Sequence, residues 1–322
     1  MKRKALLAAG AAAVAVGGVA LGADAYADRE AERAVRELAA KHSANYDVSY
    51  ASVDVSLLSR EVKINDFAMS PKGGGATLRA SSAAMGLSAE SPDQPQDFSA
   101  ENVSFDLPDG ATLKARRAEF EDAVLSSFEN PDMENWPTFA GADLEDVRVM
   151  EGEKVLASAA SAKVGNVRTG QVGSAEMEDV QFRAGPNDQE VDYFKVGSVE
   201  VQEYRVDPEA ADGSVESFSV EDIRGMAKGK AVLTGDSLEL EMPSSPDADG
   251  FRVVRASMSG FEIDSVDDAK ADKALAKLGY DRVAVDAGLE LAANRDSGRF
   301  EIRELSVEMR EGFSLSLEAE FD

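Results

Sequence analysis

The strongest constraint on the fold is a strand–turn–strand pattern that recurs along the chain. Residues 142–149 (ADLEDVRV) alternate apolar and polar side chains, and residues 155–164 continue the alternation after a short turn. A period of two is typical of a β-strand with one buried face. The two stretches therefore predict an antiparallel β-hairpin.

Three further pairs of stretches repeat this pattern. They are residues 61–69 with 76–83, 102–107 with 111–118, and 175–182 with 193–201. Together the four pairs form one degenerate unit of roughly 33 to 42 residues, a length typical of repeat architectures. We therefore expect a mainly β fold: an elongated, twisted antiparallel sheet of repeated hairpins.

The C-terminal part predicts both strands and short helices. Residues 283–291, 299–307 and 313–321 alternate as strands. Ser219–Asp222 has the composition of a helix start, with Val220, Ile223 and Met226 facing inward.

A second short helix is expected over residues 266–278. Ser265 stands at its N-cap and Gly279 directly follows its last residue. The region 207–322 is thus predicted to be α+β and to continue the sheet.

The N-terminus predicts export. Met1–Lys4 carries three basic side chains, and residues 5–23 contain no charge. Such a segment is either a membrane anchor or a signal peptide cleaved near Ala27. We favour an anchor in the inner membrane because helical sequence continues beyond it. The basic end then stays in the cytoplasm and the bulk lies in the periplasm, or is released there after cleavage.

An amphipathic helix is expected over residues 28–44. Glu32 and Arg36, like Glu37 and Lys41, are four residues apart, in the order that stabilises a helix. This helix either caps the sheet or forms a stalk. The predicted organisation is an anchor segment (1–27), a stalk or capping helix (28–45), repeated hairpins (46–206) and the C-terminal region (207–322).

Composition argues against several classes of function. With 61 acidic and 34 basic residues, the net charge is −27, which opposes binding to nucleic acid or to bare anionic lipid. The chain has no cysteine and a single histidine, His42, in the predicted stalk helix, so neither a zinc site nor a histidine-based catalytic centre is expected. Acidic pairs fall on the solvent phase of the strands. We expect no enzyme, cofactor or metal site.

Small residues on the buried phase of the hairpins mark a candidate ligand groove. Alanine fills less of the space between facing layers than leucine, so such a face is either tightly packed or open to an apolar ligand. The candidate residues are Leu78, Ala80, Leu113, Ala115, Leu156, Ala157 and Ala159.

One stretch is ambiguous. In residues 118–128, Phe120, Val124 and Phe128 fit a helix at spacing four, while the position within the repeat indicates a strand. Trp136, which follows, is expected to pack in a core.

Several stretches carry a family resemblance. Val53–Leu58, Val62–Met69 and Leu78–Ala80, behind a short N-terminal anchor, resemble the N-terminal pattern of AsmA-like and TamB-like envelope proteins. Leu278–Asp281 with residues 283–286 and 305–308 is similar to an ending found in other exported bacterial proteins. The resemblance implies an apolar β-groove that holds or moves lipid between membranes, and it assigns no individual binding residue.

The expected function is therefore a non-enzymatic protein of the bacterial cell envelope that binds lipid or another apolar ligand. The alternative is a structural or adaptor protein with a dry core and other envelope proteins as partners. A carboxylate enzyme is a third, less favoured hypothesis and would need a cleft with a carboxyl of raised pKa.

Overall fold

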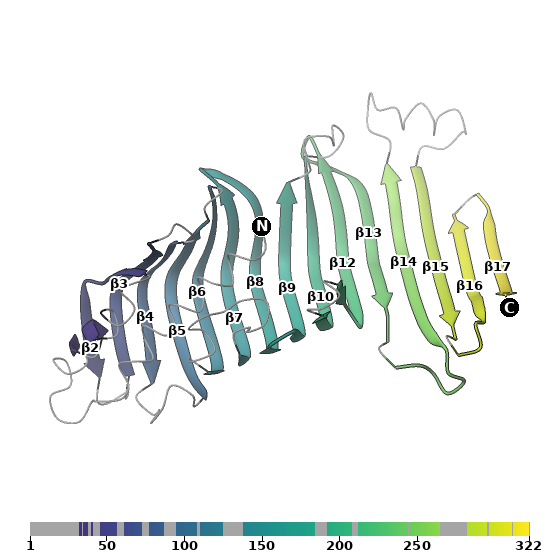
Figure 1. The fold of residues 1–322 in the computed structure, drawn as a ribbon. Helices are drawn as coiled ribbons and strands as arrows, with labels where there is room; N and C mark the ends of the chain where they lie inside the picture. Colours follow the sequence, from purple (N-terminus) through teal and green to yellow (C-terminus); the bar gives the residue numbers. More distant parts are fainter. Residues whose placement is uncertain are drawn as a thin grey trace. The chain divides into compact units, whose positions relative to one another are not determined.

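A computed structural model of the chain describes a protein built almost entirely of β-strands (Figure 1). The described residues are 32–33, 35–37, 40, 46–56, 61–72, 77–86, 95–107, 110–124, 138–183, 192–207, 212–243, 245–264, 282–294, 296–310 and 312–321. They fall into two compact units. Unit 1 lies within Met1–Ala175 and Arg205–Gly213, and unit 2 within Glu176–Tyr204 and Ser214–Asp322.

Unit 1 is an antiparallel sheet whose strands follow one another in chain order. From β2 to β8 each strand pairs with the next, and β1 also pairs with β3. The strands are β1 (Tyr46–Ser49), β2 (Ser52–Ser56), β3 (Glu61–Pro71), β4 (Thr77–Gly86), β5 (Pro95–Asp106), β6 (Ala111–Val124), β7 (Phe139–Glu151) and β8 (Lys154–Arg168).

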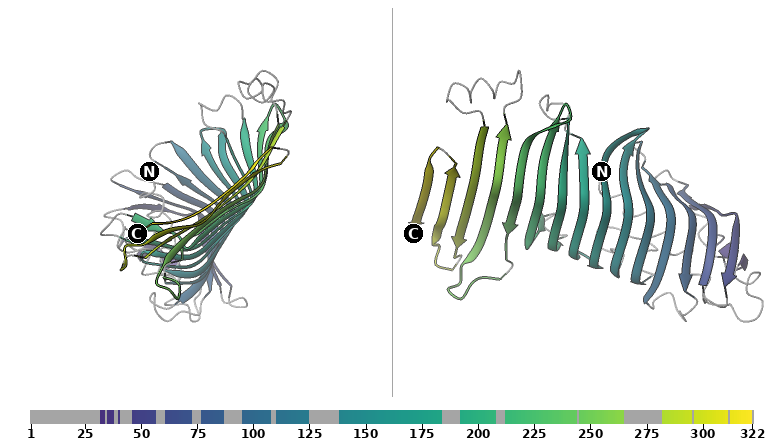
Figure 2. Two further views of the ribbon diagram at one scale, coloured as in Figure 1. Left: turned by 90° about the vertical axis from the view of Figure 1, so that its right-hand side faces the viewer. Right: turned by 180° about the vertical axis from the view of Figure 1, so that it is seen from behind.

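Unit 2 has the same plan. β10 pairs with β9 and with β12, and each strand from β12 to β17 pairs antiparallel with the next. The strands are β9 (Gln171–Arg183), β10 (Tyr193–Asp207), β11 (Asp212–Ser214), β12 (Ser217–Ala227), β13 (Lys230–Glu241), β14 (Arg252–Asp264), β15 (Arg282–Ala293), β16 (Phe300–Met309) and β17 (Ser314–Phe321). β9, β10 and β11 have residues in both units. Within each unit the strands lie side by side (Figure 2).

Residues in the left-handed conformation interrupt most strands from β3 to β14. Asp122, Asn166 and Glu203 lie on β6, β8 and β10, and six further positions lie on β3, β5, β7, β9, β12 and β14. Of these six, those in unit 1 are Asp66 on β3, Asn102 on β5 and Asp146 on β7, with φ of 50°, 49° and 51°. In unit 2 they are Asp179 on β9, Asp222 on β12 and Gly260 on β14, with φ of 50°, 53° and 64°. We call these six positions the left-handed positions. Aspartate, asparagine and glycine are the residues that tolerate this conformation best.

Each left-handed residue shifts the side-chain alternation by one position. On β3 the buried residues are Val62 and Ile64 before Asp66, then Phe67 and Met69 after it. Strict alternation would have turned Phe67 and Met69 to the opposite face. The left-handed residue Asp66 thus keeps all four buried side chains on one face.

The neighbouring strand keeps register by shifting in the same way. Asp66 lies between the pairs Asn65–Ser82 and Phe67–Ala80, so it faces Ser81 on β4. There the buried residues Ala80 and Ala83 are also three apart. The shift therefore passes from strand to strand along the sheet.

Aspartate side chains satisfy backbone groups that such irregularities expose. The Gly260 N–H donates to Oδ1 of Asp286 at 2.6 Å. A similar irregularity on β6 has Asp122 at φ 49°, and its N–H donates to Oδ1 of Asp97 at 3.0 Å. These bonds remove the cost of an unpaired N–H at the interruption.

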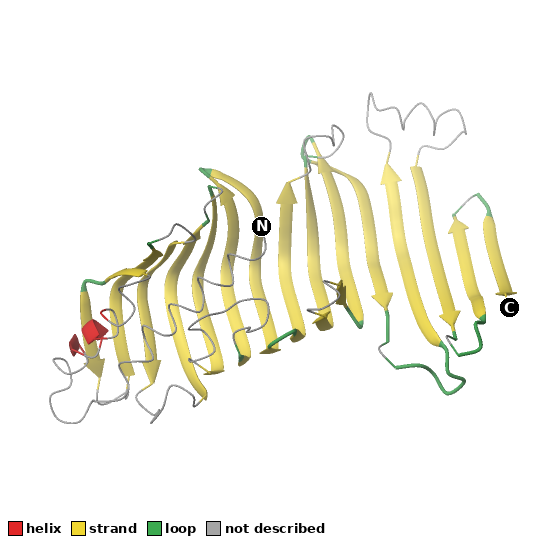
Figure 3. Ribbon diagram, viewed as in Figure 1, coloured by secondary structure: helices red, strands yellow, loops and turns green. Residues whose placement is uncertain are grey.

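The core of unit 1 lies on one face of β2–β6. Its largest fully buried side chains include Phe67, Ile64 and Met85. Val35, one of the described helical residues near β2 and β3 (Figure 3, red), is 1% exposed and packs in the same cluster. At about 1.5–3 kcal/mol for each fully buried large side chain, this face is the main source of stability in unit 1.

The predicted hairpins and the three C-terminal strands are confirmed. Residues 118–124 are strand, as the repeat indicated, because β6 extends to Val124. The described residues between 32 and 40 are helical, as expected for that stretch. Residues 5–23, His42, Trp136 and the helix expected over 266–278 lie outside the described residues.

The helix predicted from Ser219–Asp222 is wrong, because these residues belong to β12. Val220 and Ile223 are three apart and share a face, which suggested a helix. The structure produces that spacing in a strand, since the left-handed Asp222 lies between them.

Asp66 offers a direct test of the left-handed positions. Asp66→Val should lower the free energy of unfolding by about 1–3 kcal/mol, because a β-branched side chain is strained at positive φ. Asp66→Gly should not lower it by more than about 0.5 kcal/mol. Urea denaturation of the full chain measures both.

Lys63→Val, at an exposed site on the same strand, is the matched control and should be within about 0.5 kcal/mol of the natural protein. Equal effects of valine at positions 63 and 66 would contradict the account.

Candidate binding face

Most of the predicted groove residues share one face of the unit 1 sheet. One row of directly paired residues crosses the sheet from β4 to β8. In order, it is Leu78, Phe105, Leu113, Val149 and Ala157. The three alanines continue this apolar face: Ala80 pairs with Phe67, Ala115 with Val103, and Ala159 with Val147. Six of the seven predicted residues are therefore brought together.

Leu156 is the exception. Val149 pairs with Ala157, and the next pair is Met150 with Val155. Leu156 is left over between these pairs, in a β-bulge. The period-two reading of residues 155–164 does not anticipate this extra residue.

The predicted residues differ in how much surface they offer. Leu78, Ala80, Ala115 and Ala159 are buried, at 2%, 6%, 8% and 7% exposure. Leu113, Leu156 and Ala157 are half-buried. Only the second group has surface that a ligand could contact in this conformation.

Unit 2 carries a more open apolar face. Two rows of apolar side chains cross the sheet from β10 to β17, each running through directly paired residues. Row 1 is Val201, Phe218, Leu240, Ala256, Leu289, Leu305 and Leu317; row 2 is Val199, Val220, Leu238, Met258, Ala287, Val307 and Leu315. We call this surface the unit 2 apolar face. Seven strands leave six gaps of about 4.8 Å, so each row spans about 29 Å.

Large apolar side chains on this face are open to solvent. Leu238 is 37% exposed, Leu317 45% and Leu315 51%. Phe300 and Phe321 at its end are also exposed, and their ring centroids are 6.0 Å apart. A surface with this much contiguous apolar area usually marks an interaction site.

The opposite face of the same strands is polar. On each strand, the residue between its row 1 and row 2 residues belongs to this opposite face. Pairs of such residues include Ser219 with Glu239 and Ser306 with Ser316. The polar face also holds ion pairs, such as Arg255 with Glu290 at 2.9 Å. The two faces of unit 2 thus differ sharply in chemistry.

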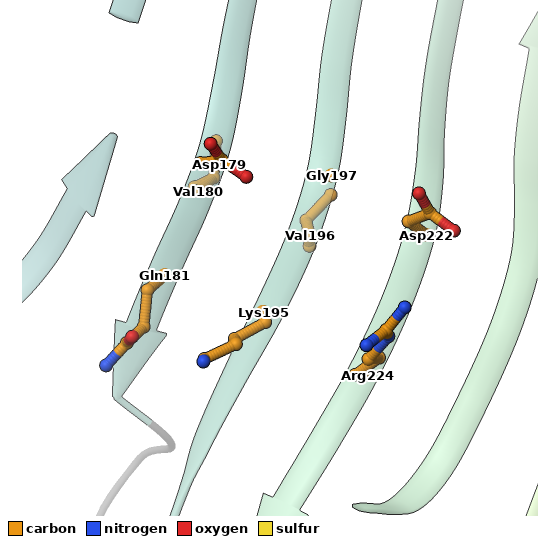
Figure 4. Close-up of a pocket in the computed structure, with 8 residues that line it drawn as sticks. All are labelled: Asp179, Val180, Gln181, Lys195, Val196, Gly197, Asp222 and Arg224. Atoms are coloured by element: carbon orange, nitrogen blue, oxygen red, sulfur yellow. The ribbon is translucent and has the colours of Figure 1, made fainter. Parts of the chain in front are cut away.

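A hollow of about 400 Å³ lies at the left-handed positions of β9 and β12 (Figure 4). Two carboxylates, Asp179 and Asp222, and two cations, Lys195 and Arg224, line it, and all four are exposed. Gly197 lets the strands approach here, since a Cβ on it would lie 2.7 Å from Cβ of Asp222. Its charges balance and none is desolvated, so the hollow does not select a charged ligand.

An ionic cluster fixes the loop between β13 and β14. Oδ1 of Asp247 accepts the Phe251 N–H at 2.9 Å, and Oδ2 accepts from Arg303 at 3.1 Å. The Phe251 N–H, followed by Arg303, holds the pKa of Asp247 below its ordinary value. The Arg303 guanidinium also lies 5.1 Å from the centre of the Phe251 ring. Both oxygens of Asp247 are engaged by the protein itself, so Asp247–Gly250 forms a structural turn.

Two further findings concern metal and membrane. Among the described residues, no group of three or more histidine, aspartate or glutamate side chains is placed to hold a metal ion. In that same part of the chain, no helix is long and apolar enough to cross a membrane.

Sequence reasoning missed the unit 2 apolar face as a candidate site. Its C-terminal strands were predicted, although β12 was not, and residues such as Leu238 and Leu240 gave the signal. The ligand groove was predicted in unit 1 because small residues recur on the buried phase of its strands. The apolar face of unit 2 differs because its large side chains are exposed.

Comparisons with known proteins leave the chain without an assigned family. No family model matches it, and no curated protein sequence matches it. The solved structure of P47 of Clostridium botulinum E1 aligns with 89% of this chain and 80% of its own, at 6% identity and a TM-score of 0.14. A TM-score that low carries no argument about fold or function.

The Asp247 cluster predicts a pH dependence of stability. Folding lowers the pKa of the Asp247 carboxyl from its unfolded value, near 3.8. The ionised carboxylate therefore stabilises the folded state fully at pH values above 3.8. This contribution is lost as the pH falls through the lower pKa of the folded state. Asp247→Asn should therefore be less stable than the natural protein at pH 7, and the difference should shrink at pH 3.

Urea denaturation at the two pH values measures this, with Asp249→Asn on the same loop as control. A difference between the natural protein and Asp247→Asn that is the same at both pH values would contradict the role of this carboxylate.

Proposed function

We propose that this chain is an exported, membrane-anchored, non-enzymatic protein of the bacterial envelope that holds lipid acyl chains, or another extended apolar ligand, on the unit 2 apolar face. The observation that carries the proposal is the exposure of large side chains, among them Leu238, Leu315 and Leu317, on a face built of continuous apolar rows.

The form of the face supports an extended ligand. The two rows are long and narrow, and they follow the direction perpendicular to the strands. No charged or amide side chain interrupts them between β10 and β17. A ligand on this surface would be recognised by apolar contact along its length, which suits an acyl chain better than a compact polar metabolite.

The charge of the chain argues for single lipid molecules and against adsorption to a bilayer. A net charge of −27 repels the surface of an anionic membrane. An acyl chain lying along the rows needs no contact with such a surface. The resemblance to AsmA-like and TamB-like proteins agrees with this proposal.

The proposed location depends on the sequence of the N-terminus. The basic residues of Met1–Lys4 and the uncharged residues 5–23 are the features of an inner-membrane anchor. The remainder of the chain would then lie in the periplasm, where it could receive lipid from the membrane that anchors it.

A pair of single variants tests lipid binding. Leu238→Glu places a charge in the middle of the unit 2 apolar face, and Gln202→Glu adds the same charge on the polar face of β10. The full-length natural protein and Gln202→Glu should retain lipid in native mass spectrometry. Leu238→Glu should retain roughly ten-fold less, because burying one leucine is worth about 1.5–3 kcal/mol.

Leu113→Glu tests the groove predicted in unit 1. Loss of lipid with this variant, but not with Leu238→Glu, would place the ligand on unit 1. A natural protein that is folded and lipid-free would contradict the proposal and favour the adaptor alternative, with a protein on the exposed face.

The membrane anchor has its own test. The full chain should stay in the membrane fraction after alkaline carbonate extraction, with an intact mass that includes Met1. Protease added to spheroplasts should digest the residues after the anchor. A soluble product beginning after Ala27 would show cleavage instead, and resistance of the chain to protease in spheroplasts would contradict export.

A further inference from the structure

β17 is an edge strand with an exposed apolar side. Among the described residues it pairs with β16 alone. Leu315 is 51% exposed, Leu317 45% and Phe321 52%, and Phe313 just before the strand is 57% exposed. In Figure 1, β17 lies beside β16 at the end of the unit 2 strands.

This edge has few of the features that normally prevent strand pairing. Proteins protect exposed edges with charged side chains (lysine above all), proline, bulges or very short strands. β17 reads SLSLEAEF over eight residues, with Glu318 and Glu320 as its only charges and no lysine, arginine or proline. The pairing of β17 with β16 has one register shift, between Ile302 and Leu305. After this shift Leu305 to Glu308 pair in order with Leu317 to Ser314.

The free backbone groups of β17 can be assigned. The Met309 N–H donates to the Phe313 carbonyl at 2.9 Å, so Phe313 bonds toward β16. Hydrogen-bonding direction alternates along an antiparallel strand, so Leu315 and Leu317 also bond toward β16. Ser314, Ser316, Glu318 and Glu320 therefore direct their N–H and C=O groups outward.

The sequence of β17 is self-complementary in the antiparallel direction. If Leu317 faces Leu317 of a second copy, then Leu315 faces Ala319, Ser316 faces Glu318, and Ser314 faces Glu320. In this register apolar residues oppose apolar residues, and each glutamate opposes a serine. The outward backbone groups also meet one another, at Ser316 with Glu318 and at Ser314 with Glu320.

We propose that β17 pairs antiparallel with β17 of a second copy of this chain, with Leu317 on the two-fold axis. The pairing joins row 1 of one copy to row 1 of the other through Leu317, so the apolar rows continue across the dimer. It also closes the exposed edge, since an isologous contact uses the same surface on both copies.

The charges of the edge are compatible with this register. Glu320 already pairs with Arg299 at 3.1 Å, which compensates its charge. The two Glu318 side chains would be diagonal neighbours, and like charges at that spacing are screened by salt. A second copy therefore fits this edge without directly opposed like charges.

Single cysteines test the register, because the natural chain has none. In full-length protein under mild oxidation, Leu317→Cys should form a disulfide-linked dimer on a non-reducing gel, since facing residues at a non-hydrogen-bonded pair lie within disulfide reach. Leu315→Cys is the matched control. Its two copies would be about 13 Å apart along the strands, four residues at about 3.3 Å each, and should not cross-link.

The double variant Leu315→Cys/Ala319→Cys should cross-link again, because these two positions face each other across the axis. Equal cross-linking of the two single variants, or none with Leu317→Cys, would overturn the proposal.

A proline variant tests the same contact without cysteine. Ser316→Pro removes an outward N–H and leaves the bonds to β16 intact, because proline is tolerated where an edge N–H faces away from the sheet. It should be monomeric and folded by sedimentation and circular dichroism, while Ser316→Thr stays dimeric. A natural protein that is monomeric at the concentrations of this experiment, or a dimeric Ser316→Pro, would overturn the proposal. None of these results depends on lipid binding.

Discussion

The structure depends on one constraint: a long strand must keep its apolar side chains on a single face. Strands of 11 to 15 residues, such as β3 and β8, exceed the usual length, and the face of every residue on them is fixed by the register. Residues in the left-handed conformation, among them one on each of β3, β5, β7, β9, β12 and β14, meet this constraint. At Asp66, Asp146 and Asp222 the alternation shifts by one, and the apolar face continues.

The same constraint separates two chemistries in unit 2. Rows 1 and 2 lie between the left-handed positions and the register shifts, and plain alternation carries their apolar residues unbroken from β10 to β17. Charged groups are restricted to the other face, where Arg255 and Arg303 form ion pairs. The aspartates at the shifts serve as conformational elements, and those that line the hollow of Figure 4 need no catalytic role to explain them. The proposed lipid site and the proposed dimer edge both follow from this arrangement.

The repeated hairpins could be predicted because their signal is local. Period-two alternation located β3 to β10 and β15 to β17, and the turn residues Glu151–Glu153 mark the end of β7 and the start of β8. The left-handed positions were harder to find, since an aspartate before a valine or isoleucine also occurs at the start of a helix. That ambiguity caused the error at Ser219–Asp222. Val220 and Ile223 are three residues apart, as are Ile64 and Phe67, and each pair has a left-handed aspartate between its members. The recurrence of this spacing is the sequence signal for a shift in the side-chain alternation.

The candidate site could be predicted only in part. The sequence placed Leu78, Leu113 and Ala157 correctly on one apolar face, because alternation fixes the face of each residue. It could not give their exposure, which depends on what packs against that face. Val35, far away in sequence from β5, is part of the core there. The open surface around Leu238 and Leu315 in unit 2 is a tertiary property for the same reason.

The most direct test of the account is a single-cysteine scan of β12 from Phe218 to Arg224 in the full-length protein. Each variant would carry an environment-sensitive fluorophore and would be mixed with lipid whose acyl chain bears a bromine quencher. The account predicts quenching at positions 218, 220 and 223, with a spacing of three across Asp222, and none at 219, 221 and 224. Quenching at 218, 220, 222 and 224, or equal fluorescence at all positions, would contradict it.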